Sequence, residues 1–515
     1  MDFVHEKAGE VPVAGEFGEL VVRFADGSFR RFPLFAGRDI ASWNRREQGC
    51  ANALPVWQDE PAYGGTVLYV SGFRLDRDDP VEVCFRPTAA GGRWLIPAVT
   101  LTEKPVRIAF TGGEKVVVGA NAEWIPVTFT DDTVAGSPLD FSSLADAPAG
   151  KYGFVRPAPD GTMTFENAPE KRLRIYGVNL CFSANYPEKK FADALAERLV
   201  RCGYNGVRFH HQDTDLLDPA ASDTLTFDPE KLDRLDYLFA ALKKRGLYLT
   251  TDFYTNRELK PGDNVPECDF SGPQLKTLMP ISRAARENWK EYVRRWMRHR
   301  NPYTGLTWAE DPALLCVNII NEDPLRANWN LSKSASNRYQ EYFAQWKKAG
   351  NPDNFTLFLS ELQGKCLDEL QVFLKDGLKM KTMVTSLNFL QSSALTVMRD
   401  RFEVIDVHNY FDHPSFPKTK WAAPYLFRQQ SAVGGAAKPL TDLMACRIFN
   451  KPFLVTEINF CNPNRYRAEY GPLIGGYAAL QEWSGIFRFT WTHSAWGVER
   501  GASRPPFMFD IAGDP

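Results

Sequence analysis

The sequence predicts a (β/α)8 barrel that follows a domain built only from β-strands. Short strand-like runs separated by turn residues fill residues 1–130, with no helical period among them. After residue 170, apolar runs of strand length alternate with amphipathic helical patterns. No glycine-rich phosphate loop follows the first of these runs, which favours a closed barrel over a doubly wound open sheet.

Residues 1–130 are expected to form a β-sandwich that serves as an accessory domain. The clearest hairpin joins residues 20–24 to 29–32 through Asp26-Gly27, where glycine permits the positive φ of a tight turn. Further strand-like runs lie at 66–75, 81–86, 94–101, 106–110, 116–118 and 124–130. The domain is interpreted as a packing module, with sugar binding as the alternative.

Residues 131–170 are expected to form a linker and a hairpin that lead into the barrel. The composition shifts to Asp, Ser, Pro, Ala and Gly over residues 131–160, as is typical of a chain that crosses a surface. A second hairpin is expected at 154–165, around Pro159-Asp160-Gly161.

The barrel is expected to occupy residues 171–515. Its first strand is 175–179, and Phe191, Leu195 and Leu199 mark one face of the helix that follows. After a second strand at 206–209, Asp228 is placed to cap a helix that has Pro229 at its first position. The third strand is 247–251.

The same alternation continues to the end of the chain. Strands are expected at 314–320, 382–387, 404–407, 453–456 and 486–490, and helices near 285–298, 336–348, 357–378, 393–401, 440–449 and 466–483. The surplus over a minimal barrel of about 250 residues is expected as an insertion near 323–354, after the fourth strand.

Composition excludes several classes of protein. The chain has 515 residues, with 61 basic and 63 acidic side chains and a net charge of −2. Hydrophobic residues make up 44% and charged residues 24%, which excludes disordered and fibrous proteins. The near-neutral balance gives no basic surface for nucleic acid.

No membrane or export segment is visible in the sequence. No apolar run is long enough to span a bilayer, and the first residues, MDFVHEKAGE, lack the basic and apolar regions of a secretory signal. Nine cysteines occur without CxxC pairs, as is typical of small buried residues in a reducing compartment. We therefore expect no membrane partner and a cytoplasmic location.

Polar residues follow the apolar strands at the end where barrel loops converge. They are Asn179, Arg208, His210, His211, Asp213, Asp252, Tyr254, Asn321, Glu322, Asn388, His408, Tyr410, Glu457, Asn459, Trp491 and His493. Because the C-terminal ends of barrel strands meet on one face, we expect these side chains to share a pocket.

Glu322 and Glu457 are the candidate catalytic residues. Each terminates a nearly continuous apolar run, and burying an unpaired carboxylate costs several kcal/mol, so each must be hydrogen-bonded or functional. Two carboxylates across a barrel mouth meet the requirement for glycosidic bond cleavage, in which one protonates the leaving oxygen and the other attacks or stabilises the sugar centre.

These strand ends, taken in order, resemble clan A glycoside hydrolases, most nearly the cellulase-like family 5 barrels, over residues 170–500. The residues that carry the resemblance are Asn321-Glu322 after the fourth strand, His408-x-Tyr410 after the sixth, Glu457 after the seventh and Trp491 after the eighth. It is the presence of all four in the right strand order that makes the match specific.

The resemblance implies retaining hydrolysis of a β-linked oligo- or polysaccharide. We expect no cofactor and no metal. It implies that Glu322 is the acid/base and Glu457 the nucleophile. Substrate-binding roles are implied for Asn321 on the sugar 2-hydroxyl, Tyr410 and Arg208 beside Glu457, His408 in the −1 subsite and Trp491 as its stacking floor. Arg208 is expected to keep Glu457 ionised, while Glu322 needs surroundings that raise its pKa.

Two departures from the family concern the sugar subsites. The run VRFHHQD at 207–213 carries two histidines, of which His210 is counted among the substrate-binding residues, and the third strand ends in Asp252 where a histidine is common. His210 and His211 are not expected to form a metal pair, because adjacent strand residues point to opposite faces. Trp329, Trp421 and Trp496 are candidates for sugar stacking or for packing.

Other functions stay open at this point. A non-catalytic carbohydrate-binding barrel could keep the pocket, although a binding protein has no need of both carboxylates. A metal-dependent barrel hydrolase is a second alternative. A transglycosylase would share every residue named above.

Overall fold

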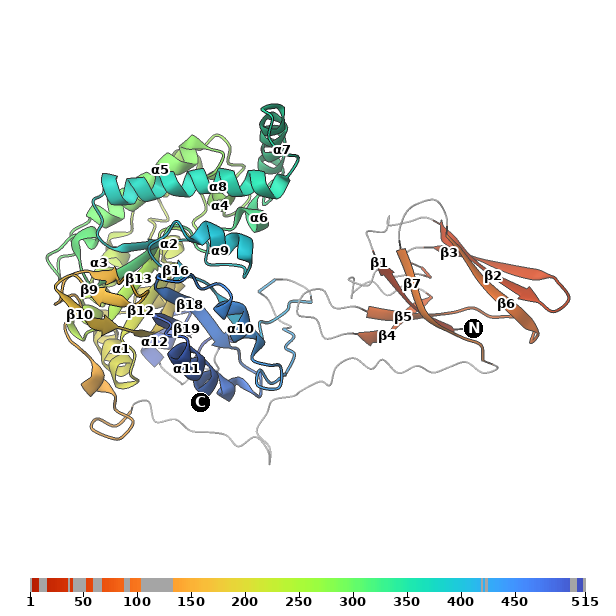
Figure 1. Ribbon diagram of the computed structural model, residues 1–515, viewed down its shortest axis with the longest axis horizontal. Coiled ribbons are helices and arrows are strands. Elements are labelled where there is room, and N and C mark those ends of the chain that lie inside the picture. Colours follow the sequence, from red (N-terminus) through yellow and green to blue (C-terminus); the bar gives the residue numbers. More distant parts are fainter. Residues whose placement is uncertain are drawn as a thin grey trace. The chain divides into compact units, whose positions relative to one another are not determined.

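The structure is a computed structural model that describes residues 2–8, 16–35, 38–39, 52–58, 67–87, 93–102, 133–417, 420–421, 425–500 and 507–512 (Figure 1). It divides into two compact units. One comprises Met1–Pro126 and Asp412–Gln429, and the other comprises Val127–Phe411 and Gln430–Pro515.

The N-terminal unit contains two antiparallel sheets. One has the order β4 (Ala53–Gln58), β5 (Val67–Gly72), β1 (Asp2–Ala8), β7 (Arg93–Thr100), and the other has the order β3 (Phe29–Phe35), β2 (Glu16–Phe24), β6 (Pro80–Pro87). The expected hairpin is present as β2 and β3, with Gly27 at a φ of 83°. The expected strands at 106–110, 116–118 and 124–130 lie outside the described residues, and face-to-face packing as a sandwich stays a prediction.

A small sheet lies at the N-terminal end of the barrel strands. The hairpin expected at 154–165 is present as β8 (Val155–Pro157) and β9 (Met163–Phe165), and an unforeseen strand, β10 (Ala168–Leu173), pairs with β9. Met163 and Phe165 belong to the main hydrophobic core, and the Phe165 ring lies 6.1 Å from that of Tyr248, where β13 begins. This sheet therefore packs on the barrel end opposite to the predicted site.

The second unit holds a parallel sheet with the strand order of a (β/α)8 barrel. Its strands are β11 (Ile175–Cys181), β12 (Gly206–His210), β13 (Tyr248–Asp252), β14 (Leu314–Asn318), β15 (Met383–Thr385), β16 (Ile405–Asp406), β17 (Asn409–Phe411), β18 (Phe453–Phe460) and β19 (Gly485–Thr492). β16 and β17 are two pieces of the sixth position, and both pair with β18. β11 pairs with β12 on one side and with β19 on the other, so the first and last strands are neighbours, as a barrel requires.

The strand ladder has a seam between β15 and β16. Within the described residues, the ordered pairing runs from β15 through β11 and β19 to β16 without joining its two ends. Asn388 spans this gap: its carbonyl accepts a hydrogen bond from the His408 amide at 2.7 Å, and its Nδ2 donates to Asp406 Oδ2 at 3.2 Å. We refer to Asn388 and these two bonds as the seam clasp.

Helices alternate with the barrel strands (Figure 1). They include α1 (Lys189–Arg201), α3 (Pro229–Lys244), α5 (Arg283–Arg298), α8 (Phe355–Val372), α9 (Ser393–Arg399), α10 (Lys438–Met444), α11 (Tyr470–Leu480) and α12 (Ala495–Arg500). The Asp228 side chain accepts from the amides of Glu230 and Lys231, which is the N-cap expected for α3. The stretch expected as an insertion holds α6 (Leu325–Asn328) and α7 (Lys333–Lys348).

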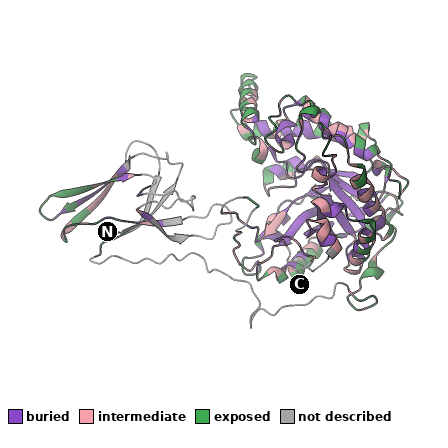
Figure 2. Ribbon diagram, turned by 180° about the vertical axis from the view of Figure 1, so that it is seen from behind, coloured by how far each residue is buried: buried purple, intermediate pink, exposed green. Residues whose placement is uncertain are grey.

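Burial follows the barrel strands (Figure 2). All residues of β12, β13, β14 and β18 are buried, which explains why these strands read as continuous apolar runs rather than as alternating ones. Among the described residues, no helix is both long and apolar enough to cross a bilayer.

Candidate active site

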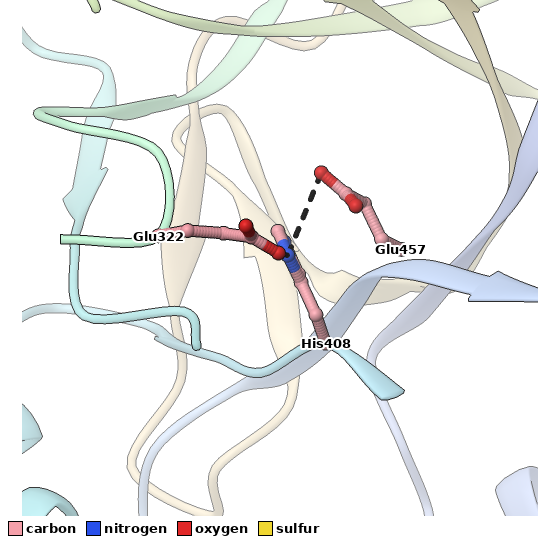
Figure 3. Close-up of side chains that lie close together, drawn as sticks. All are labelled: Glu322, His408 and Glu457. Carbon is pink, nitrogen blue, oxygen red and sulfur yellow. Dashed lines mark hydrogen bonds and ion pairs between the residues drawn. The ribbon is translucent and has the colours of Figure 1, made fainter. Parts of the chain in front are cut away.

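Glu322, His408 and Glu457 point toward one another from three different parts of the barrel (Figure 3). Glu457 is the fifth residue of β18, Glu322 follows β14, and His408 lies between β16 and β17. One oxygen of each carboxylate and one nitrogen of the imidazole all lie within 4.8 Å of one another. The two glutamates predicted from separate strand ends therefore share one site.

Arg208, on β12, connects most of the other polar groups at the mouth. Its Nη1 donates to Glu457 Oε1 at 2.6 Å, and its Nη2 donates to Asp252 Oδ1 and to Asn321 Oδ1, both at 2.8 Å. The side chain is only 1% exposed. Two carboxylates raise the pKa of Arg208 against the effect of burial, so this guanidinium is a fixed positive charge beside Glu457.

His210 is held between Asp252 and Glu457. Its Nδ1 lies 2.7 Å from Asp252 Oδ2, and its Nε2 lies 3.4 Å from Glu457 Oε1. Asp252 also accepts from Arg208 and, at 2.8 Å, from Asn318 Nδ2, so it acts as an acceptor throughout this network and His210 Nδ1 donates to it. Asp252 thus fixes the orientation of a ring that faces Glu457.

His408 donates from both ring nitrogens. Nδ1 lies 3.2 Å from Glu322 Oε1 and 3.5 Å from Glu457 Oε1, whereas Nε2 lies 3.0 Å from Thr456 Oγ1. The Thr456 hydroxyl gives its own proton to Asp406 Oδ2 at 2.6 Å, so it accepts from His408. Burial lowers the pKa of His408, but Glu457 and Glu322 outweigh it and raise that pKa above the ordinary value.

Glu322 is held more loosely than Glu457. Its side chain is 31% exposed against 4% for Glu457, whose Oε2 accepts the Tyr410 hydroxyl proton. Glu322 also has a left-handed backbone with φ of 50°, and its amide donates to Asn388 Oδ1 at 2.7 Å. A non-glycine residue in this region is uncommon, and such residues cluster at functional sites.

The pKa directions differ from those expected from the sequence. Burial acts to raise the pKa of Glu322, but the hydrogen bond and charge of His408 outweigh it and hold the pKa at about 2. Burial raises the pKa of Glu457 above its usual range, against the charges of His408 and Arg208. The expected order was wrong, because the imidazolium of His408 is hydrogen-bonded to Glu322 and not to Glu457.

The same three groups are the one set of nearby His, Cys, Asp and Glu side chains in the described residues that could hold a metal ion. However, Glu457 Oε1 is already bound by Arg208 at 2.6 Å and Oε2 by the Tyr410 hydroxyl. A cation there would face a fixed guanidinium and would have to displace the imidazolium of His408. The donor set therefore fits proton transfer better than metal binding.

Trp491 does not lie where the resemblance implied. Its side chain belongs to the main hydrophobic core and meets the Tyr204 ring edge-on at 6.5 Å. Phe489, two residues earlier, lies 5.7 Å from the His210 ring and 5.6 Å from the Tyr410 ring. The pairing of β19 with β11 shifts register between Val178 and Leu180, so the alternation of faces is broken and phenylalanine takes the inner position.

The two adjacent histidines also differ from expectation. Their rings lie 3.8 Å apart rather than on opposite faces, because His211 is already past β12 and has a left-handed backbone with φ of 53°. Trp329 packs against Phe355 and Tyr339, at 4.9 and 6.3 Å, and is a packing residue. Arg208, His210, Asn321, His408 and Tyr410 all join the network around the glutamates.

Sequence reasoning missed Asp406 and Thr456. Asp406 is fully buried within β16, accepts from the Thr456 amide and hydroxyl, and also receives the seam clasp. A signal was present, because an aspartate inside the short apolar run at 404–407 must have buried partners.

Comparisons with known proteins give only distant structural likenesses. No family model matches the sequence, and no curated protein matches it. An endo-1,4-β-mannanase from Rhizomucor miehei has a TM-score of 0.45 at 13% identity, covering 65% of this chain and 90% of that one. A glycoside hydrolase family 5 mannosidase from the same organism has a TM-score of 0.44 at 15% identity, with 71% and 91% covered.

A β-glucanase from Saccharophagus degradans has a TM-score of 0.38 at 14% identity, with 71% and 90% covered. These similar structures are glycoside hydrolases by name, which is the class that the strand ends resemble. At such values the fold rests on the strand pairing of this chain, and its chemistry rests on the residues at the mouth.

Proposed function

We propose that the protein is a retaining β-glycoside hydrolase in which Glu457 is the nucleophile and Glu322 the acid/base. The observation that supports this most is the spacing of the two carboxylates, with one oxygen of each within 4.8 Å at the mouth of a barrel. Retaining enzymes hold the two groups about 5–5.5 Å apart, whereas inverting enzymes need about 6.5–9.5 Å to admit a water molecule.

The surroundings of the glutamates support this division of roles. A nucleophile must be aimed, and Glu457 is fixed by Arg208 and the Tyr410 hydroxyl on its two oxygens. The acid/base must exchange protons with substrate and then with water, and Glu322 is the more exposed of the two. Asn321 Oδ1 is engaged by Arg208, which leaves its Nδ2 to bind a sugar hydroxyl.

Proton delivery follows from the position of His408. The bond from His408 holds the pKa of Glu322 low. A leaving-group oxygen that enters between these two side chains breaks that bond, so Glu322 gains proton affinity as substrate binds. Glu457 then attacks the anomeric carbon as Glu322 protonates the departing oxygen, and water releases the sugar with Glu322 as base.

The test is hydrolysis of chromogenic β-glycosides and of β-linked glucan, mannan, galactan and xylan by the wild type and by Glu457→Ala. We expect one sugar to be cleaved and the variant to lose at least about 10⁴-fold in turnover. Added azide is expected to restore part of the turnover of Glu457→Ala, with an α-configured glycosyl azide as the product.

Full activity in Glu457→Ala would remove this residue from the mechanism. Binding of oligosaccharide without hydrolysis by the wild type would instead favour a non-catalytic carbohydrate-binding barrel.

A further inference from the structure

Three aromatic rings from three strand ends form a stack beside the proposed catalytic site. Phe182 directly follows β11, His211 directly follows β12, and His493 directly follows β19. The Phe182 and His211 rings are stacked at 4.4 Å with 9° between their planes, and the His493 ring lies 6.1 Å from Phe182 at 29°. We call these three residues the ring stack.

The ring stack is connected to the catalytic network. The His211 ring lies 3.8 Å from that of His210, whose Nε2 faces Glu457. On the other side, the His493 ring lies 5.6 Å from Phe489, which contacts Tyr410. The stack therefore stands one residue away from the nucleophile, on the side of the mouth formed by β19, β11 and β12.

Two of the three residues of the ring stack have a left-handed backbone. Phe182 has a φ of 50° and His211 a φ of 53°, and bulky side chains are unfavourable in this left-handed region. Packing alone does not require it, because Gly or Asn would fit the same backbone at lower cost. Residues of this kind cluster at functional sites, and here two of them stack on each other beside the catalytic network.

The imidazoles leave one nitrogen each for a ligand. His211 Nδ1 lies 3.1 Å from Asn256 Nδ2, which can only donate, so the His211 proton is on Nε2. His493 Nδ1 lies 2.5 Å from Asp510 Oδ1 and gives its proton there. Neither Nε2 has a hydrogen-bond partner among the residues that the structure describes, and both rings are partly exposed.

We propose that the ring stack is a substrate-recognition site that binds hydroxyl groups of the sugar unit next to the one attacked by Glu457. A hydroxyl group both donates and accepts, and the stack offers one ring nitrogen at His211 Nε2 and a second at His493 Nε2. Phe182 holds the two imidazoles apart at a fixed spacing. The ligand class is a neutral β-linked oligosaccharide, which rests on the proposed function.

Two variants separate recognition from chemistry. His493→Phe keeps a ring in the stack but removes its nitrogens, and Phe182→Gly removes the spacer ring at a backbone angle that glycine accepts readily. Lys379→Gly is the matched control, because Lys379 is exposed, has a φ of 58° and lies just before β15, at the opposite end of the barrel.

The substrates are mannotetraose and cellotetraose, compared with 4-nitrophenyl β-mannoside and β-glucoside, which carry no second sugar unit and so offer the ring stack no hydroxyl groups. We expect both variants to lose roughly five- to tenfold in kcat/KM on the tetrasaccharide, mainly through KM, and less than about twofold on the monoglycoside. Equal losses on both substrates, or no loss on either, would overturn the proposal.

Calorimetric titration with the tetrasaccharides keeps this proposal separate from the hydrolase proposal. If the wild type cleaves nothing but binds a tetrasaccharide, and His493→Phe weakens that binding, the hydrolase proposal fails and the ring stack stands. If the wild type binds neither tetrasaccharide, the ring stack is not a sugar site.

Discussion

The two sides of the barrel mouth hold the same type of side chain in opposite ways. Glu457 lies inside β18, is almost fully buried and is bonded on both oxygens by Arg208 and Tyr410. Glu322 lies after β14, is about one-third exposed, and its carboxylate has a single imidazole as partner among the residues that the structure describes. The first side fixes a carboxylate in place, and the second leaves one free to change partners.

The proposed roles of the two carboxylates rest on this difference in how each is restrained. Arg208 bonds Glu457, Asp252 and Asn321 at once, so the β12 side of the mouth behaves as one rigid unit. The Glu322 side depends on His408, whose proton can follow the substrate. Four predictions test whether the two sides differ in this way.

The largest effect is expected from Glu322→Gln, which keeps the size of the side chain but cannot supply a proton. Substrates with poor leaving groups should lose about 10²–10⁴-fold in kcat/KM, and those with good leaving groups far less. Because the pairing with His408 holds the pKa of Glu322 low, loss of the charge should also lower the free energy of unfolding at pH 7, and this loss is measured separately from the loss of activity. The measurements are steady-state kinetics over a leaving-group series and urea denaturation; a uniform loss would contradict the role as acid.

Arg208→Met should act mainly on stability. It leaves Asp252 and Glu457 buried without their shared cation, and breaking a buried ion pair costs about 3–5 kcal/mol. The loss of unfolding free energy is measured by chemical denaturation. The control is Arg86→Met, because the Arg86 side chain is 54% exposed. Equal stability of the two variants would mean that the β12 side is not the rigid one.

Tyr410→Phe removes one hydrogen bond from Glu457 and leaves the ring contacts with Phe489 and Phe509 in place. Turnover should fall by roughly tenfold, because a hydrogen bond to a charged group is worth about 1.5–3 kcal/mol and part of it is retained by Arg208. Thermal stability measured on the same samples should stay close to that of the wild type. A change in stability alone would make Tyr410 a structural residue.

The smallest effect is a dependence of stability on pH through His408. Its pKa is raised in the folded state, so its charged form stabilises the protein fully below the unfolded pKa of 6.5. That contribution is lost as pH rises through the folded pKa. The difference in unfolding free energy between wild type and His408→Gln should therefore shrink from pH 5.5 to 8.5, and a constant difference would show that His408 is not charged there.

The sequence was most informative where a polar residue interrupts a buried run. Glu322, Glu457 and Arg208 were found in this way, because the strands around them have no exposed face that could explain a charge. The order of the strands followed from the alternation of runs and helices. These are local signals, and the barrel topology brings them together without further information.

Details that depend on irregular backbone could not be read from the sequence. The exchange of Trp491 for Phe489 depends on a register shift in β19, and the contact between His210 and His211 depends on a left-handed residue. Neither feature changes the two-residue alternation of side chains from which strand faces are predicted. The order of the two glutamate pKa values depends on which carboxylate His408 bonds. Its Nδ1 lies 3.2 Å from Glu322 Oε1 and 3.5 Å from Glu457 Oε1, a difference that no sequence pattern encodes.

The seam clasp has a consequence for how the protein loses activity under stress. Asn388 joins the two ends of the strand ladder and also accepts the Glu322 amide, so the closure of the sheet and the position of Glu322 both depend on one residue. Hydrostatic pressure or mild denaturant that parts the seam would carry Glu322 away from Glu457 while both halves stay folded. Inactivation should then precede the loss of helical signal, and amide exchange should begin at His408.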